Sequence, residues 1–143
     1  NVYSRQLYEN RLVVALPASH PLTAKNVIGI EDLIDQPFIG YGAEIPIGQL
    51  VRKLLSDADI ILRPTVEVQQ IHVACALVQA GVGIALIDEI TANGPVWTKV
   101  VFRPIEPTAK TPISIVHGMY EPLSRLAQAF IATLESVQIH WSR

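Results

Sequence analysis

Side chains able to do acid–base or metal chemistry are few in this chain of 143 residues. The four histidines show no metal-ligand spacing with one another or with the single cysteine, Cys75. Asp88 and Glu89 are adjacent carboxylates at the end of an apolar run. Neighbouring residues of a strand point to opposite faces, so this pair suits a solvated cluster better than an acid–base dyad. We therefore expect neither an enzyme nor a bound cofactor or metal.

Amides at the start of a helix offer binding chemistry instead. Gln69 and Gln70 follow a short β-branched run, residues 65–68, and precede a helix predicted from Ile71. Ligands of open α/β sheets bind outside the carboxyl ends of the strands, and the free N–H groups of a helix N-terminus favour a carboxylate. Neither glutamine is a preferred N-cap residue. Either a ligand or water satisfies those donors.

A second candidate stretch is Gly40, Tyr41 and Gly42, which ends another predicted strand, residues 38–41. The two glycines allow a ligand to approach the backbone closely. Tyr41 offers a ring and a hydroxyl to a ligand, or packs as a half-buried residue. His72, in the first helical turn after Gln70, either contacts a ligand or is a satisfied rim histidine.

The elements that must position these residues are predicted from hydrophobic spacing. From Ile71, apolar residues recur at the i, i+3, i+4 and i+7 positions of one helix face, and Val73 and Leu77 widen that face, which predicts a helix buried on most sides. Gly81 suits the left-handed turn that ends such a helix. Residues 83–87 form an apolar run typical of a strand covered on both faces. This order predicts a βαβ unit with Cys75 in the core.

Further strands are predicted at residues 12–16, 100–103 and 113–117, and a helix at residues 49–57. A last amphipathic helix begins after Pro122. Its apolar stripe consists of Leu123, Leu126, Ala127, Phe130, Ile131, Leu134 and Val137. The stripe requires a partner surface, which is either the sheet of its own domain or a second lobe or subunit.

Composition excludes several classes of protein. The net charge is −2 and no lysine or arginine run is present, so this segment does not look like a nucleic-acid binder. No apolar run reaches the roughly 18 residues that span a bilayer, and the start lacks a signal-peptide pattern. We expect a cytoplasmic protein that does not enter a membrane.

Four segments in the same order resemble the LysR-type transcriptional regulators. Residues 7–22 are similar to the entry into the second lobe of the effector-binding domain of this family, and residues 28–39 to its next segment. Residues 66–88, with the pattern A-G-V-G-I-A-L, resemble its most recognisable stretch. Residues 113–137 resemble the return into the first lobe.

The resemblance implies an α/β fold of the periplasmic-binding-protein-like type 2, with an effector in the cleft between two lobes. It divides the chain into an entry segment (1–11), the second lobe (12–104) and a return crossing, strand and helix of the first lobe (105–143). It places Gly40, Tyr41, Gly42, Gln69, Gln70 and Ile71 on the second-lobe wall of the cleft, and His117 near the crossing strand. The implied ligand is a small, carboxylate metabolite.

The resemblance also implies a regulator that dimerises or tetramerises and binds DNA through a winged helix-turn-helix outside the given sequence. The first half of the first lobe, on the order of 70–80 residues, also lies outside it. Two alternatives share the fold: a solute-binding lobe of a transport-type protein, and an enzyme such as a dehydratase. We expect this chain to self-associate and to bind an effector weakly.

Overall fold

The computed structural model describes residues 1–94 and 96–137. It divides into two compact units, residues 11–110 and residues 1–10 with the chain from Thr111 onward. Strand β1 (Val2–Pro17) contributes its first residues to the second of these and its remainder to the unit of residues 11–110. Each unit is described by itself.

The unit of residues 11–110 is built on a mixed sheet with the strand order β2-β6-β1-β5-β3-β4. The strands are β2 (Ile28–Gly29), β3 (Phe38–Tyr41), β4 (Val66–Val68), β5 (Ile84–Asp88) and β6 (Val100–Glu106), together with β1. Strand β1 is antiparallel to β5 and β6, whereas β3 is parallel to both β4 and β5. Parallel strands need crossover connections, which are the helices of this unit.

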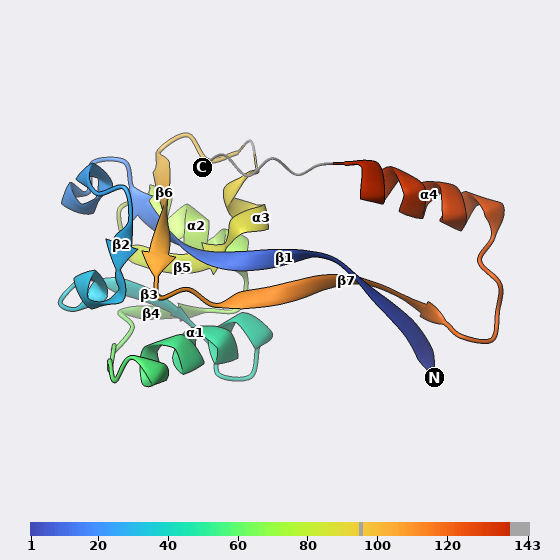
Figure 1. The fold of residues 1–143 in the computed structure, drawn as a ribbon. Coiled ribbons are helices and arrows are strands. Elements are labelled where there is room, and N and C mark those ends of the chain that lie inside the picture. Colours follow the sequence, from blue (N-terminus) through green and yellow to red (C-terminus); the bar gives the residue numbers. More distant parts are fainter. Residues whose placement is uncertain (95, 138–143) are drawn as a thin grey trace. The chain divides into compact units, whose positions relative to one another are not determined.

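Two helices make those crossovers and lie on either side of β3 (Figure 1). Helix α1 (Pro46–Asp57) connects β3 to β4, and α2 (Ile71–Gln79) connects β4 to β5. The predicted βαβ unit, which consists of β4, α2 and β5, is therefore confirmed. Strand β3 lies between β4 and β5 in the sheet. The short elements η1 (Pro21–Ala24), η2 (Ile30–Leu33) and α3 (Glu89–Ala92) complete this unit.

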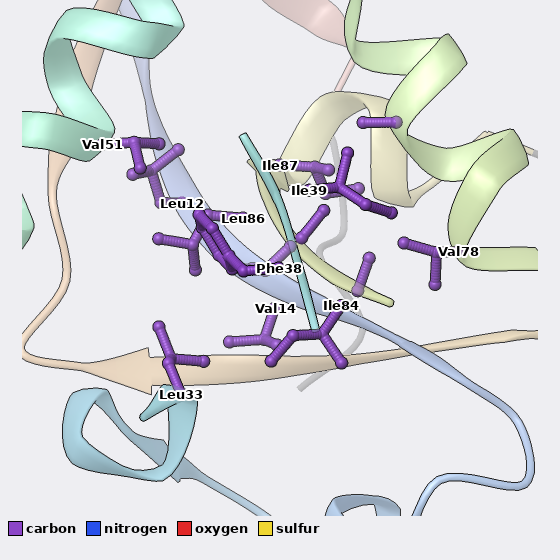
Figure 2. Close-up of a cluster of buried hydrophobic side chains, with 14 of the residues drawn as sticks. Leu12, Val14, Leu33, Phe38, Ile39, Val51, Val78, Ile84, Leu86 and Ile87 are labelled. Atoms are coloured by element: carbon purple, nitrogen blue, oxygen red, sulfur yellow. The ribbon is translucent and has the colours of Figure 1, made fainter. Parts of the chain in front are cut away.

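The core fills the space between the sheet and these helices. Residues 84–87 of β5 are all buried, as the continuous apolar run predicts for a strand covered on both faces. Figure 2 shows β3 with side chains from α1 on one side and from α2 on the other. The labelled core residues are Leu12, Val14, Leu33, Phe38, Ile39, Val51, Val78, Ile84, Leu86 and Ile87.

Helix α2 differs from its prediction in how much of its surface is covered. Only Ala74, Cys75 and Val78 are buried, and Val73 is 42% exposed. The expectation of burial on most sides is therefore wrong, because this nine-residue helix packs along a single face. The left-handed turn after it is confirmed, since Gly81 has φ 80°.

The other unit contains the start of β1, β7 (Lys110–Gly118), which pairs with β1, and α4 (Arg125–Ser136). Burial alternates along β7, as its period of two predicts. Helix α4 begins after Ser124, whose Oγ accepts a hydrogen bond from the Ala127 N–H at 3.1 Å. Its apolar stripe is only partly covered within the unit, and Leu126 is 81% exposed and Phe130 62% exposed.

The helices within residues 1–94 and 96–137 are all too short or too polar to cross a bilayer.

Candidate ligand-binding site

The candidate site lies where β3 and β4 end. Tyr41 and Val68 are register partners in the parallel β3–β4 pair. Beyond them, the N–H of Gly42 donates to the carbonyl of Val68 at 3.3 Å. Gly42 and Gln69 each follow their strand directly, so the loops that precede α1 and α2 start side by side at one edge of the sheet. The structure thus brings together the two stretches that the sequence singled out.

The ends of two flexible side chains reach the space beside the Gly42 Cα. A Cβ placed there would lie 2.7 Å from Nε2 of Gln69 and 2.8 Å from the carboxyl carbon of Glu44. Gly48 lies in the first turn of α1, and a Cβ at Gly48 would collide with the Gly42 carbonyl oxygen. The first turn of α1 therefore packs directly against the end of β3.

Both helices begin at this edge without a side-chain cap. The N-cap residues are Ile45 for α1 and Gln70 for α2, and neither side chain accepts a hydrogen bond from the first turn. The backbone N–H groups of a first helical turn have no partner within the helix and carry partial positive charge, although Pro46, the first residue of α1, has no N–H to contribute. Two such termini at one edge of a sheet favour an anionic group.

Tyr41 takes part in the site through its backbone. Its side chain is 3% exposed, and its hydroxyl donates to the carbonyl of Leu86 at 2.8 Å. Burial raises the pKa of this phenol, and nearby Cys75 and Asp88 add to the effect. The Tyr41 carbonyl accepts a hydrogen bond from Nη2 of Arg52 at 3.1 Å, and the same guanidinium lies 3.5 Å from Glu67. The ring packs in the core, and only the strand end faces the loops.

The predicted polar residues of the second stretch are accessible. Gln69, Gln70 and His72 are exposed, and Ile71 is half-buried. One turn further along α2, Cys75 is buried, and desolvation raises the pKa of its thiol to about 12. The thiol is therefore not available to a ligand at this edge.

His117 belongs to the other compact unit, on β7. Its ring centroid lies 5.0 Å from that of Tyr3, with the rings tilted by 36°. Its Nδ1 lies 3.0 Å from the carbonyl oxygen of Gly118. A hollow of about 300 Å³ in this unit is lined by His117 and Tyr3 together with residues of α4. A role for His117 in the cleft stays a prediction.

A further surface hollow, of about 360 Å³, lies between α1 and residues 59–62. Leu55 and Ile61 are among its lining residues, whereas Gly42 and Gln69 are not. Its lining is mixed, and Arg52, Ser56 and Asp59 are its polar members. We place the candidate site at the ends of β3 and β4 because the two uncapped helices begin there, and not because of volume.

Glu89 behaves differently from its prediction as part of a solvated cluster. It is 6% exposed, and its carboxylate accepts two hydrogen bonds from Arg11, at 3.0 Å from Nε and 2.7 Å from Nη2. This ion pair favours the charged guanidinium and raises the pKa of Arg11. Its neighbour Asp88 caps α3 by accepting from the Thr91 N–H at 2.6 Å. The prediction failed because Glu89 begins a helix instead of ending a strand.

Sequence reasoning also passed over Glu44, which lies in the loop between β3 and α1. An exposed acid in a glycine-containing loop gives no periodic signal. Its only indication in the sequence is its position two residues before Pro46, the first residue of α1. In the described part of the chain, no group of three or more His, Cys, Asp or Glu side chains could hold a metal ion.

A mixed α/β sheet with a candidate ligand site at its strand ends is typical of a ligand-binding domain. Comparison with known sequences identifies the family. The family model of the LysR substrate binding domain matches residues 1–138, so the chain belongs to that family. The fold is accordingly periplasmic-binding-protein-like, as the resemblance predicted.

Individual relatives agree with this assignment. The chain is 29% identical over 124 residues to the transcriptional activator protein LysR of Escherichia coli, covering 87% of this chain and 40% of that protein. The effector binding domain of a variant of BenM, a regulator of Acinetobacter baylyi, has 30% identity and a TM-score of 0.70 over 93% of this chain and 63% of that one.

The regulatory domain of CcmR from Synechocystis, solved in complex with 2-PG, shares the fold at 21% identity, with a TM-score of 0.79 over 98% of this chain and 68% of that one. The chain spans 40–44% of the length of these curated relatives.

Proposed function

We propose that this chain is the effector-sensing part of a cytoplasmic DNA-binding transcriptional regulator and that it binds a small carboxylate at the carboxyl ends of β3 and β4. The observation that carries the proposal is that two helices without a side-chain cap both begin after the neighbouring ends of β3 and β4. Gly40, Tyr41 and Gly42 supply one side of the site, and Gln69, Gln70 and Ile71 supply the other. DNA is contacted by a separate winged helix-turn-helix.

Elementary electrostatics explains why a carboxylate fits. A charge at a helix terminus gains about 0.3–1 kcal/mol at an exposed site, so two termini together supply only part of a stable complex. The exposed amides of Gln69 and Gln70 add donors that carry no charge of their own. We expect this chain alone to bind carboxylates in the millimolar range, and tighter binding when a second lobe encloses the ligand.

Self-association forms a second part of the proposal. Leu126 and Phe130 lie one turn apart on α4 and are largely exposed. Exposed apolar stripes of this kind mark surfaces that another chain or segment covers. We expect a dimer or tetramer in the regulator, and concentration-dependent association of this chain.

The alternatives have weaker support. The curated relatives named above are transcription regulators, which favours a sensor over a transport-type binding protein or an enzyme. The buried acid most suited to catalysis, Glu89, is already held by two hydrogen bonds from Arg11. A carboxylate that accepts two hydrogen bonds from an arginine has a structural role and is poorly suited to proton transfer.

An amide NMR titration of this chain tests the carboxylate site. Pentanoate should shift the signals of Gly42, Gly48, Ile71 and His72, whereas pentanamide should not. Ile71→Pro removes one first-turn N–H, and Gln70 before it has φ −135° and ψ 140°, which a following proline accepts. This variant should bind pentanoate more weakly. Arg125→Pro, at the first residue of α4, is the matched control. Shifts confined to another surface would contradict the proposal.

A further inference from the structure

The loop acid Glu44 gives the candidate site a property that a simple carboxylate site lacks. The carboxyl carbon of Glu44 and Nε2 of Gln69 lie 2.8 Å and 2.7 Å from one point, the position that a Gly42 side chain would occupy. An anionic group and a hydrogen-bond donor therefore converge from two loops over the same glycine. Both side chains are exposed, so both groups are accessible to a ligand.

Glu44 has no cationic partner in the part of the chain that the structure describes. The structure gives its exposed side chain no ion pair or hydrogen bond among residues 1–94 and 96–137. The nearest basic residue along the following helix, Arg52, is engaged with the Tyr41 carbonyl and with Glu67. Lys53, the next one, pairs with Asp57 at 2.7 Å.

An unpaired carboxylate beside an anion site has a predictable effect on selectivity. It repels a ligand that carries only a carboxylate, and it attracts one that also carries a cation. An ammonium group donates three hydrogen bonds and accepts none, so it pairs with Glu44 and cannot pair with the amide nitrogen of Gln69. A ligand carboxylate, which only accepts hydrogen bonds, suits that nitrogen and the helix N–H groups instead.

We propose that Glu44 makes this site selective for an effector that carries both an ammonium and a carboxylate group, as an amino acid does. The inference rests on the proposed carboxylate site and narrows its ligand class. Glu44 acts as a specificity-determining residue that contacts the ligand amine, and Gln69 orients the carboxylate beside it.

Matched ligand pairs test this selectivity. The probes are 5-aminopentanoate with pentanoate and L-leucine with 4-methylpentanoate, titrated into the whole chain and followed through the amide signals of Gly42 and Ile71. Because the pair with Glu44 is solvent-exposed, we expect the amino member of at least one pair to bind about three- to fivefold more tightly. Glu44→Gln should abolish that preference and tighten binding of the member that lacks the amine.

Glu31→Gln is the matched control, because Glu31 lies beside β2 at the opposite edge of the sheet from β4. It should leave the preference unchanged. Equal or tighter binding of pentanoate and 4-methylpentanoate by the unaltered chain would overturn the selectivity and leave the carboxylate site standing. If no probe shifts Gly42 or Ile71 in the unaltered chain or in Glu44→Gln, both the site and its selectivity are wrong.

Discussion

Gly48→Ala sets two opposing effects against each other at the candidate site. In a helix interior, alanine is more favourable than glycine by about 0.5–1 kcal/mol. Against this, the new Cβ would collide with the Gly42 carbonyl oxygen and lie 3.3 Å from the Tyr41 Cβ. These are atoms of the main chain and of its first side-chain carbon, so no rotamer change relieves the collision. Overpacking of this kind costs about 1–3 kcal/mol.

The collision should win, and we expect Gly48→Ala to lose about 1–2 kcal/mol of unfolding free energy in urea titrations followed by circular dichroism. The variant should also shift the amide signals of Gly42 and Ile45 and weaken pentanoate binding, because the first turn of α1 moves away from the end of β3. Stability equal to or above that of the unaltered chain would refute the reasoning.

Two other glycines separate the effect of a steric collision from the effect of backbone strain. At Gly118, an added Cβ meets no atom within 4 Å, so Gly118→Ala should change stability by less than about 0.5 kcal/mol. At Gly81 the space is equally free but φ is 80°, so Gly81→Ala should cost about 1–2 kcal/mol from backbone strain alone. Neither control should alter pentanoate binding.

Three further predictions concern groups outside the site. Glu89→Ala should lose about 1–3 kcal/mol in urea unfolding, because it removes both hydrogen bonds to Arg11; a change within the error of the titration would mean that the pair is dispensable. The hydrogen bond from the Lys25 ammonium holds the pKa of Asp32 below its usual 3.8, so the stability that this group contributes is complete above about pH 4 and is lost as the pH falls through its lower folded pKa. Asp32→Asn should therefore show less loss of stability than the unaltered chain between about pH 5 and pH 3, and parallel pH profiles would argue against the ion pair. The Cys75 thiol is buried and has a pKa of about 12, so little of it is ionised at pH 8. It should react with a disulfide reagent at pH 8 at least about 100-fold more slowly in the folded chain than in urea. Rapid stoichiometric labelling of the folded chain would show that the thiol is accessible.

Hydrophobic spacing predicted the sheet and its helices well, since it depends on neighbours in the chain. The strand at residues 38–41 and the helix from Ile71 both occur where the spacing places them. The left-handed turn at Gly81 was equally predictable, because φ above zero leaves few residue choices. Each of these features depends on residues that are close together in the chain, so a short stretch of sequence is enough to predict it.

Contacts between distant residues were beyond such reasoning. Arg11 meets Glu89 because β1 and β5 are antiparallel, with Leu12 opposite Asp88, and no local pattern contains that register. Glu44 and Gln69 meet over Gly42 only because β3 and β4 end together. The sequence analysis placed Gly42 and Gln69 at strand ends but missed Glu44. Glu44 and Gln69 belong to different loops, so no local pattern indicates that they lie close together.

The contact between Gly42 and Gly48 has a practical consequence for anyone who converts this domain into a biosensor. Because a Cβ at Gly48 would collide with the main-chain oxygen of Gly42, variation at Gly48 would damage the scaffold before it changed the ligand. A library should keep Gly48 and vary Ala43, Glu44, Gln69 and Gln70, whose side chains are exposed at the same edge. Gly48 then keeps the first turn of α1 against the end of β3 while the ligand selectivity is varied.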